Sequence, residues 1–415
     1  MGILLHTMQP FIFSLLKQNH PIEMNRDQFS RWFSGFVDGE GNFQVFLDRN
    51  YLRAIFRIRL HIDDIAILYK IQKFLGVGKV QINNNSCVFV IYKLEDLTNV
   101  LFPLLDQYNL FTTKWLDYLD FKLVVNYLIT ARTTRLNEEL ALWIHPLIKG
   151  MNLGRTEFNF SLIPAIITID SFWLLGFIEA EGTFGLKNFS PFFQIGQNIR
   201  SYKVMDSIIA FLQSLPKRFL FSVNTLSPHV SNSLNTATNV SALSINNIDA
   251  LYDYLMFFLL DMPFQTRKAV DFYYWCIILH FHKFGFFYLP EGKALTAKIA
   301  SYINDGSYST NPNKGIAPSI DEIIHLLNLP LPVSLTPEML HVDLAKAFAK
   351  LVNDRNIWVY DNGVLMNAQP FHSFAAAMRS IGYASSSVAA RRTLDTGKLV
   401  GGRYTFYSFP QDSSN

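Results

Sequence analysis

One short segment occurs twice in this chain, and the repeat constrains the fold more than any other feature of the sequence. Residues 32–43 read WFSGFVDGEGNF and residues 173–184 read WLLGFIEAEGTF, at a fixed offset of 141 residues. The identical positions are Trp32 and Trp173, Gly35 and Gly176, Phe36 and Phe177, Glu40 and Glu181, Gly41 and Gly182, and Phe43 and Phe184. Agreement this dense at one offset indicates a structural unit that is present twice.

The residues after each copy are predicted to form the same succession of elements. After the first copy come two strand-like segments around a turn at 49–50, and then a helical pattern from 63 to 75. After the second copy come strand-like segments around a turn at 188–191, and then a helical pattern from 202 to 212. Residues 227–241, rich in Asn and Ser, are predicted to be a loop that leads into a strand. Each half is therefore expected to be α+β.

The repeats and the composition shifts divide the chain into six segments. We expect a poorly defined leader at 1–27, a first half-domain at 28–140, an inter-repeat linker at 141–169, a second half-domain at 170–303, a linker with short helices at 304–355 and a small module at 356–409. Within this module, predicted helices at 373–380 and 386–394 flank Gly382, which is typical of a helix-turn-helix.

The apolar composition requires that a membrane protein be considered. Half of the 415 residues are hydrophobic, and the mean hydropathy is +0.16. However, the most apolar stretches, 255–264 and 272–284, are short or interrupted by charges, whereas a membrane span needs about 20 apolar residues. We therefore predict that no membrane is a partner of this chain.

Small residues four positions apart lie in both copies of the repeat, Gly35 with Gly39 and Gly176 with Ala180. This spacing puts them on one face of a helix, where two backbones can approach closely. The two repeated helices are therefore predicted to pack against each other through Gly35 and Gly176. The glycine that ends each helix, Gly41 or Gly182, is expected to adopt the left-handed conformation that often terminates helices.

The last turn of each repeated helix is acidic, and it contains Glu40 in one copy and Glu181 in the other. Acids at this end of a helix are unfavourable by about 0.3 to 1 kcal/mol each. Two such ends near a shared axis need a compensating cation, for which Mg²⁺ is the natural candidate because it prefers few carboxylates together with water and phosphate oxygens. For a single copy the alternative is a solvated helix end, but the duplication favours a metal site.

The segments FSGFVDGEG and LLGFIEAEG resemble the two signature nonapeptides of the LAGLIDADG homing endonucleases, in the monomeric two-motif branch. The resemblance covers about residues 28 to 300. It implies a pseudo-two-fold pair of αββαββα half-domains with saddle-shaped DNA-binding sheets, acting as a monomer on double-stranded DNA. It also implies that Glu40 and Glu181 bind the metal ions, together with the backbone carbonyls of Gly39 and Ala180.

The same resemblance implies hydrolysis of two phosphodiesters, one in each strand, with the metal ions activating water. Lys114 and Lys268 match the lysine position of the family, and each opens a helix with the pattern Lys-x-x-Asp. Arg57 and Gln194 match its polar position on the second strand of each half. These six side chains, Glu40, Glu181, Lys114, Lys268, Arg57 and Gln194, are the predicted catalytic residues.

Polar faces on the predicted hairpins are the candidate DNA-reading surface, because side chains in the major groove can separate all four base pairs. The first half offers Asn42, Gln44, Arg53, Arg57, Arg59 and His61, and the second offers Thr183, Lys187, Gln194 and also Asn198. The second set has few cations, which departs from expectation. Residues 341–415 hold eight Lys+Arg against five Asp+Glu, whereas the first 340 residues hold 28 of each. The tail therefore adds Arg391, Arg392, Lys398 and Arg403 as DNA-binding candidates.

The predicted function is site-specific, Mg²⁺-dependent cleavage of both DNA strands at a long recognition site, which promotes the mobility of an intron. An alternative is an RNA maturase that assists the splicing of a group I intron, since relatives of this family serve that role. A degenerate DNA-binding protein is disfavoured by the paired acids. The high phenylalanine content, 37 residues, and the habit of the family indicate an organelle-encoded protein of a fungal mitochondrion.

Overall fold

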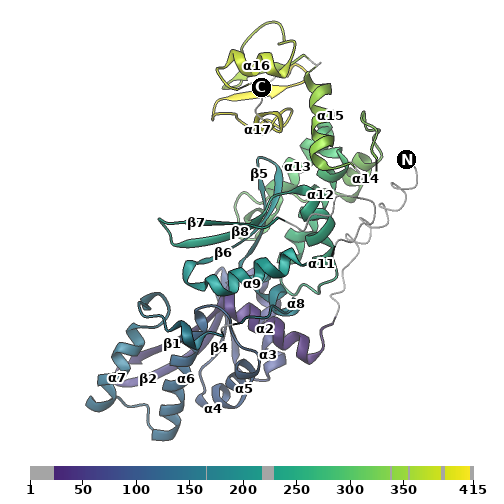
Figure 1. The fold of residues 1–415 in the computed structure, drawn as a ribbon. Helices are drawn as coiled ribbons and strands as arrows, with labels where there is room; N and C mark the ends of the chain where they lie inside the picture. Colours follow the sequence, from purple (N-terminus) through teal and green to yellow (C-terminus); the bar gives the residue numbers. More distant parts are fainter. Residues whose placement is uncertain are drawn as a thin grey trace.

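Two similar halves pack around a central pair of helices, and a tail extends past the second half to a small separate module (Figure 1). The computed structural model describes residues 23–411, except 165, 217–228, 337–338, 354–355 and 385–387. Most of the predicted leader, residues 1–22, lies outside the described residues. Helix α2 begins at Arg26, one residue before the predicted end of that leader.

The first half begins with helix α2, which Asn25 and Gln28 close in a reciprocal capping box. Its elements are α2 (Arg26–Glu40), β1 (Gly41–Asp48), β2 (Tyr51–His61), the 3₁₀ turn η1 (Ile62–Asp64), α3 (Ile65–Leu75), β3 (Lys79–Asn83), β4 (Ser86–Ile91), α4 (Leu94–Asp96), the π-helical turn η2 (Leu97–Leu101), α5 (Phe102–Gln107) and α6 (Lys114–Ala131). The predicted helix from 63 to 75 is therefore a 3₁₀ turn followed by α3.

The second half repeats this order. It consists of α8 (Ser171–Glu181), β5 (Gly182–Lys187), β6 (Ser190–Asn198), η5 (Ile199–Ser201), α9 (Tyr202–Gln213), β7 (Ser231–Asn235), β8 (Val240–Ile245), α10 (Ile248–Ala250), η6 (Leu251–Met256), α11 (Phe257–Leu260), α12 (Lys268–Phe284), η7 (Phe286–Tyr288) and α13 (Pro290–Tyr302). The two sheets have matching antiparallel orders, β1-β2-β4-β3 and β5-β6-β8-β7. The α+β fold predicted from the repeat is confirmed.

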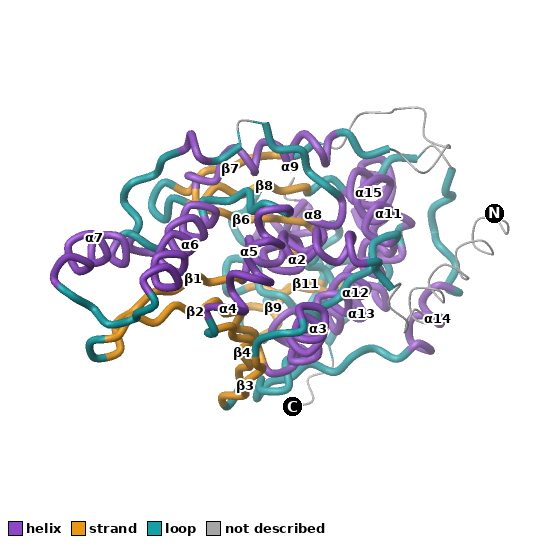
Figure 2. Tube along the Cα trace, turned by 90° about the horizontal axis from the view of Figure 1, so that it is seen from below, coloured by secondary structure: helices purple, strands orange, loops and turns teal. Residues whose placement is uncertain are grey.

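Each sheet has an apolar face and a polar face, because side chains alternate along its strands. On β2, Leu52, Ala54, Phe56 and Ile58 are buried, and the arginines between them are exposed. Helices cover the apolar faces, and one large hydrophobic core runs through both halves. Helices α2 and α8 lie side by side at its centre (Figure 2). In the described part of the chain, no helix is both long and apolar enough to cross a membrane.

The prediction of a loop over residues 227–241 is wrong for part of that range. Residues Ser231–Asn235 form strand β7, which pairs with β8 at the edge of the second sheet. Most of β7 is exposed, and its polar side chains bond across to β8, as between Ser241 and Asn232 at 2.8 Å. An edge strand exposed on both faces needs no apolar alternation, so the pattern gave no sign of it.

The connector and the tail hold short elements. They are α7 (Glu138–Lys149), η3 (Asn152–Gly154), η4 (Phe160–Leu162), η8 (Asn304–Ser307), α14 (Ile320–Leu327), α15 (His341–Asn353), β9 (Trp358–Asp361), β10 (Val364–Leu365), α16 (Phe374–Ser380), α17 (Val388–Arg391) and β11 (Tyr404–Tyr407). The tail module has its own core and a three-stranded sheet in the order β10-β9-β11.

The second predicted helix of the module, 386–394, is shorter than expected. Residues 385–387 lie outside the described residues, and α17 ends at Arg391. The Thr393 hydroxyl donates to the Ala390 carbonyl at 2.6 Å, and Asp395 has a φ of 60°. A Thr side chain that bonds a nearby backbone carbonyl in this way competes with the hydrogen bonds of the helix, which favours its early end.

The start of α15 packs on the second half through His341, and this contact makes stability depend on pH. His341 is 8% exposed, and its Nε2 lies 3.1 Å from the Tyr288 hydroxyl. Burial lowers the pKa of His341 to about 4; Arg392 and Lys283 lower it as well, whereas Asp249 raises it. Protonation therefore favours the unfolded chain, in which histidine has a pKa of about 6.5.

We expect the pH dependence of the unfolding free energy to differ between the wild type and His341→Gln. As the pH falls from 7 to 5, the wild type should lose about 2 kcal/mol relative to the variant, because only the wild type binds a proton at this position on unfolding. Urea denaturation of both proteins at pH 7 and pH 5 measures the unfolding free energies. Subtracting the variant from the wild type cancels the contributions of all other titrating groups, because both proteins contain them. Parallel pH profiles would show that His341 is not held neutral.

Candidate active site at the paired helix ends

Helices α2 and α8 touch through their backbones at the two repeated glycines. A Cβ on Gly35 would lie 1.9 Å from the Trp173 carbonyl oxygen, and one on Gly176 would lie 2.0 Å from the Trp32 carbonyl oxygen. One turn further on, a Cβ on Gly39 would lie 3.1 Å from Cγ of Glu181. The C-terminal ends of the two helices therefore meet, and both repeated glutamates emerge at this junction.

The glycine after each helix is not left-handed, so that prediction is wrong. Gly41 has φ −67° and ψ 145°, and Gly182 has φ −72° and ψ 145°. The chain passes directly into strands β1 and β5, which needs extended backbone. Glycine is required for space instead, because a Cβ would lie 2.7 Å from the Val37 or Ile178 carbonyl oxygen.

The other acid of each helix end, Asp38 or Glu179, is used by the fold. Both are buried, and burial raises the pKa of each to about 6, against the effect of their hydrogen bonds. Asp38 accepts the Thr112 N–H at 3.0 Å, and Glu179 accepts the Thr266 N–H at 2.6 Å. These bonds fix the turns that lead into α6 and α12.

The turns place a lysine beside each helix end. Nζ of Lys114 donates to the Gly39 carbonyl at 2.5 Å, and Nζ of Lys268 donates to the Gly182 carbonyl at 2.6 Å. Burial lowers the pKa of both ammonium groups, while acids that include Glu40 and Glu181 raise it. The two predicted lysines thus lie at the predicted acids, one from each half.

The surroundings of Glu40 would be stabilised by an additional positive charge, either a proton or a metal ion. Burial, and then the negative charge of Glu181, raise the pKa of Glu40 to about 7, whereas Lys114 and Lys268 lower it. Carboxylate and carbonyl oxygens are the ligand types that Mg²⁺ and Ca²⁺ take. No set of three or more His, Cys, Asp or Glu side chains in the described residues is arranged to hold a metal. The residues therefore fit an ion that draws its other ligands from water and substrate.

Arg57 and Gln194 occupy equivalent positions in the two sheets. Arg57 pairs with Asn42 across β1 and β2, and Gln194 pairs with Thr183 across β5 and β6. Nε of Arg57 donates to Oδ1 of Asn42 at 3.1 Å. Their cross-strand partners, Asn42 and Thr183, directly follow the glycines at the ends of α2 and α8, so both positions lie next to the helix ends.

The outer faces of the two sheets differ in charge. Arg53, Arg57 and Arg59 are exposed along β2. Gln44 is half-buried on β1, and the Thr183, Lys187 and Asn198 side chains are exposed on the second sheet. The second sheet therefore offers one cation from its predicted set, as its sequence indicates.

The module's four predicted cations have different environments. Arg403 forms two bonds to the Asp361 carboxylate, and Arg391 lies 5.8 Å from the centroid of the Phe374 ring. Lys398 reaches the tip of the β5–β6 hairpin, where it donates to Oδ1 of Asn188 at 3.2 Å. The charge of Arg392 acts on buried His341, at the start of α15. The module therefore adjoins the second sheet.

A repeated asparagine contact escaped detection in the sequence. Asn152 donates its side-chain amide to the Phe43 carbonyl at 2.9 Å and its N–H to Asp117 at 3.0 Å. Asn304 does the same to Phe184 at 3.2 Å and to Asp271 at 2.8 Å. These contacts explain the aspartate of both Lys-x-x-Asp patterns. The only signal was an Asn at the end of each half, at an offset of 152 rather than 141.

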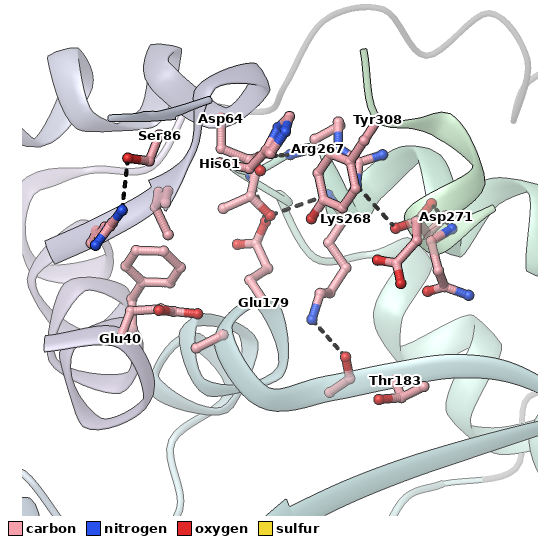
Figure 3. A pocket seen from close by; sticks show the side chains of 18 of the residues that line it. Glu40, His61, Asp64, Ser86, Glu179, Thr183, Arg267, Lys268, Asp271 and Tyr308 are labelled. Carbon is pink, nitrogen blue, oxygen red and sulfur yellow. Dashed lines mark hydrogen bonds and ion pairs between the residues drawn. The ribbon is translucent and has the colours of Figure 1, made fainter. Parts of the chain in front are cut away.

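A cavity of about 540 Å³ opens beside the helix ends, between the two halves. Figure 3 shows Glu40 on one side of it and Lys268 on the other. Its wall combines acidic, basic and polar groups, among them Glu40, Arg59, His61, Asp64, Thr183, Arg267, Lys268, Asp271, Asp305 and Tyr308. A phosphodiester beside the acids would therefore meet cationic side chains from both halves.

Comparison with known proteins identifies this arrangement. Residues 33–125, and again 174–279, match the model of the LAGLIDADG endonuclease family. The chain belongs to the LAGLIDADG endonuclease family. The two matched regions contain the two helix ends and the two lysines, so each LAGLIDADG half contributes one acid and one lysine to the junction.

Relatives of this LAGLIDADG chain occur in fungi. It is 25% identical to the mitochondrial protein RF1 of Saccharomyces cerevisiae over 364 residues, which are 83% of this chain and 75% of that protein. It is 28% identical over 269 residues to a protein named probable intron-encoded endonuclease 3 of Neurospora crassa, covering 59% of this chain and 49% of that protein.

Solved structures share the LAGLIDADG fold. The meganuclease I-SmaMI bound to uncleaveable DNA matches with a TM-score of 0.56 at 23% identity, over 66% of this chain and 98% of that one. The homing endonuclease I-LtrWI bound to target DNA matches with a TM-score of 0.57 at 20% identity, over 68% of this chain and 99% of that one. Nearly the whole of each neighbour is covered, so about a third of this chain is additional to the shared fold.

Proposed function

We propose that this chain is a site-specific DNA endonuclease that hydrolyses one phosphodiester in each strand of a long target, in the presence of Mg²⁺, and so promotes the mobility of its intron. The observation that carries the proposal is the meeting of Glu40 and Glu181 at the ends of two packed helices, with Lys114 and Lys268 beside them. Membership in the endonuclease family supports it, as do the DNA-bound structural neighbours.

The chain's own groups have distinct roles in this mechanism. Glu40, Glu181 and the carbonyls of Gly39 and Ala180 would hold Mg²⁺. The ion, when bound, supplies an activated water and stabilises the leaving 3′ oxygen. Lys114 and Lys268, whose pKa burial lowers, would each orient water or phosphate at its own strand.

The outer groups bind and position the target. Arg57 and Gln194, which are equivalent in the two sheets, would orient the scissile phosphates. The other predicted DNA-binding residues would contact bases and phosphates in the major groove. They lie between Asn42 and His61 in the first half and between Thr183 and Asn198 in the second. The tail module would extend this surface, because Lys398 joins it to the tip of the cation-poor second sheet.

RNA maturation of a group I intron is a second proposed activity, favoured by the scarcity of cations on the second sheet. That face offers Thr183, Lys187, Gln194 and Asn198, of which only Lys187 is charged, whereas DNA affinity depends strongly on phosphate neutralisation. We also propose that the protein acts as a monomer in a fungal mitochondrion. The mitochondrial relative and the intron-encoded relative support this location.

The proposed function can be tested by selecting the sequences that the protein cleaves from a library of DNA duplexes. We expect the purified chain with Mg²⁺ to cleave a subset of a randomised duplex library, leaving both strands cut within one recurrent sequence. Parallel binding assays with the precursor RNA of its own intron test the second activity. If no duplex is cleaved but the intron RNA is bound and spliced faster, the maturase role replaces the nuclease role. If neither occurs, both proposals are wrong.

A further inference from the structure

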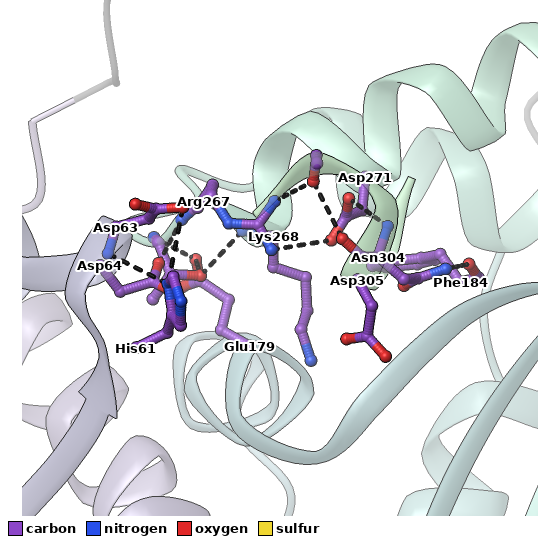
Figure 4. A network of polar contacts seen from close by, with 12 residues as sticks. His61, Asp63, Asp64, Glu179, Phe184, Arg267, Lys268, Asp271, Asn304 and Asp305 are labelled. Atoms are coloured by element: carbon purple, nitrogen blue, oxygen red, sulfur yellow. Dashed lines mark hydrogen bonds and ion pairs between the residues drawn. The ribbon is translucent and has the colours of Figure 1, made fainter. Parts of the chain in front are cut away.

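The segment that follows α13, residues 304–310, crosses from the second half to the first, and we name it the strap. The N–H of Ser309 donates to Asp63 at 2.7 Å, and its hydroxyl bonds to the same carboxylate. The Thr310 hydroxyl lies 2.7 Å from Nε2 of His61. The strap therefore fastens the end of the second half to the end of strand β2. Figure 4 shows the start of the strap, where Asn304 bonds to Asp271.

The strap also holds the side chain of Arg267, which precedes Lys268. The Tyr308 ring lies between His61, with ring centroids 4.2 Å apart, and the Arg267 guanidinium, 4.0 Å from its centroid. The Arg267 guanidinium also donates to Ser307, and its backbone N–H donates to Asp64 at 3.1 Å. Arg267 is thus fixed in the wall of the cavity that contains Glu40.

The first half has no equivalent of this arginine. The residue before Lys114 is Thr113, and its N–H donates to Ser201 at 3.4 Å. The arginine found on that side is Arg155, which bonds to Asp117 at 2.7 Å and to Asp120. Arg155 is therefore already paired with two carboxylates.

Arg267 is less fully neutralised than Arg155. In the described part of the chain, the carboxylate within ion-pair distance of Arg267 is that of Asp271, at 3.8 Å. Its Nε is buried and has no hydrogen-bond partner among the described residues. Of the acids in the same wall, Glu179, Asp64 and Asp271 each accept a backbone N–H. The planar fork of a guanidinium suits the oxygens of a phosphodiester.

We propose that Arg267, held by the strap, binds a DNA phosphate on the Lys268 side of the site, and that this contact makes the two cleavage sites unequal. The inference rests on the proposed function. Arg267 touches the substrate, whereas Tyr308 is a positioning residue that acts through it. Loss of either should impair one strand more than the other.

The first test follows each strand separately on the duplex recovered by selection, with a different dye on each strand. In single-turnover reactions, Arg267→Met should slow one strand by about 10²-fold and the other by only a few fold. Arg267→Lys should slow the same strand less, and Tyr308→Ala should have an effect similar to that of Arg267→Lys. Tyr308→Phe should leave the cleavage rates of both strands near those of the wild type. Lys73→Met, which removes an exposed charge from α3 on the helical side of the first half, is the matched control.

The second test measures binding without a metal ion. Duplexes carrying one neutral methylphosphonate at successive positions near the cut should identify a phosphate whose neutralisation weakens the wild type but not Arg267→Met. The inference would be overturned if Arg267→Met, Arg267→Lys and Tyr308→Ala slowed both strands equally, or if no phosphate showed this difference. Cleavage by the wild type would still uphold the proposed function in either case. A wild type that cuts no duplex would sink both. If Arg267→Met does not fold, the Arg267→Lys rates and binding decide.

Discussion

Replacing either Glu40 or Glu181 with glutamine should reduce DNA cleavage by about 10³-fold or more while leaving the fold intact. The carboxamide keeps the shape of the side chain but cannot carry the negative charge that draws a divalent cation. The pKa of Glu40 is raised to about 7 by burial and by Glu181. Removing one negative charge relieves this repulsion, so the variants should be at least as stable as the wild type.

Three measurements separate a catalytic role from a structural one. Cleavage of the selected duplex should be lost, metal-free DNA binding should be retained or tightened, and the midpoint of urea denaturation should not fall. Glu95→Gln, which makes the same change at an exposed position on α4, should behave like the wild type in all three. Wild-type cleavage by both active-site variants would show that the metal acids have been assigned wrongly.

The features that sequence alone predicted share a local origin. The spacing of the small residues in each repeated helix and the alternation of β2 depend on residues two to four positions apart, so the pattern of Arg53, Arg57 and Arg59 identifies an exposed face directly. The glutamates at 40 and 181 could be chosen because glycine follows them and both copies agree. That choice is consistent with the structure, in which the other acids, Asp38 and Glu179, bind backbone N–H groups.

The features that sequence missed depend on contacts between distant segments. Asn152 and Asn304 make the same bonds in the two halves, but the offset between them differs from that of the helices. The strap resembles an ordinary linker rich in Asn, Gly and Ser, and only its contacts with distant residues, such as Asp63 and Arg267, distinguish it. Gly41 was predicted to be left-handed because such glycines often end helices, whereas here its role is to avoid the Val37 carbonyl.

Replacing Gly176 with alanine should destabilise the protein by about 3 kcal/mol, at the upper end of the usual cost of overpacking. The new Cβ would lie 2.0 Å from the Trp32 carbonyl oxygen and 2.8 Å from the Phe36 nitrogen. Both are backbone atoms, so no side-chain rotation can relieve the overlap and α2 and α8 must separate. The gain from alanine's better helix propensity, about 1 kcal/mol, is too small to compensate.

Because the same helices carry the proposed catalytic acids at their ends, this substitution should also affect activity beyond the loss of stability. A displacement of about 1 Å at the site costs on the order of 10²-fold in rate, so the folded fraction of Gly176→Ala should cleave slowly even at low temperature. Urea denaturation and single-turnover cleavage measure the two effects. Gly196→Ala on β6, where the added Cβ would meet Val240 at an ordinary 3.5 Å, should leave stability nearly unchanged. A Gly176→Ala variant as stable as this control would mean that the helices do not meet backbone to backbone, and the shared position of Glu40 and Glu181 would lose its structural basis.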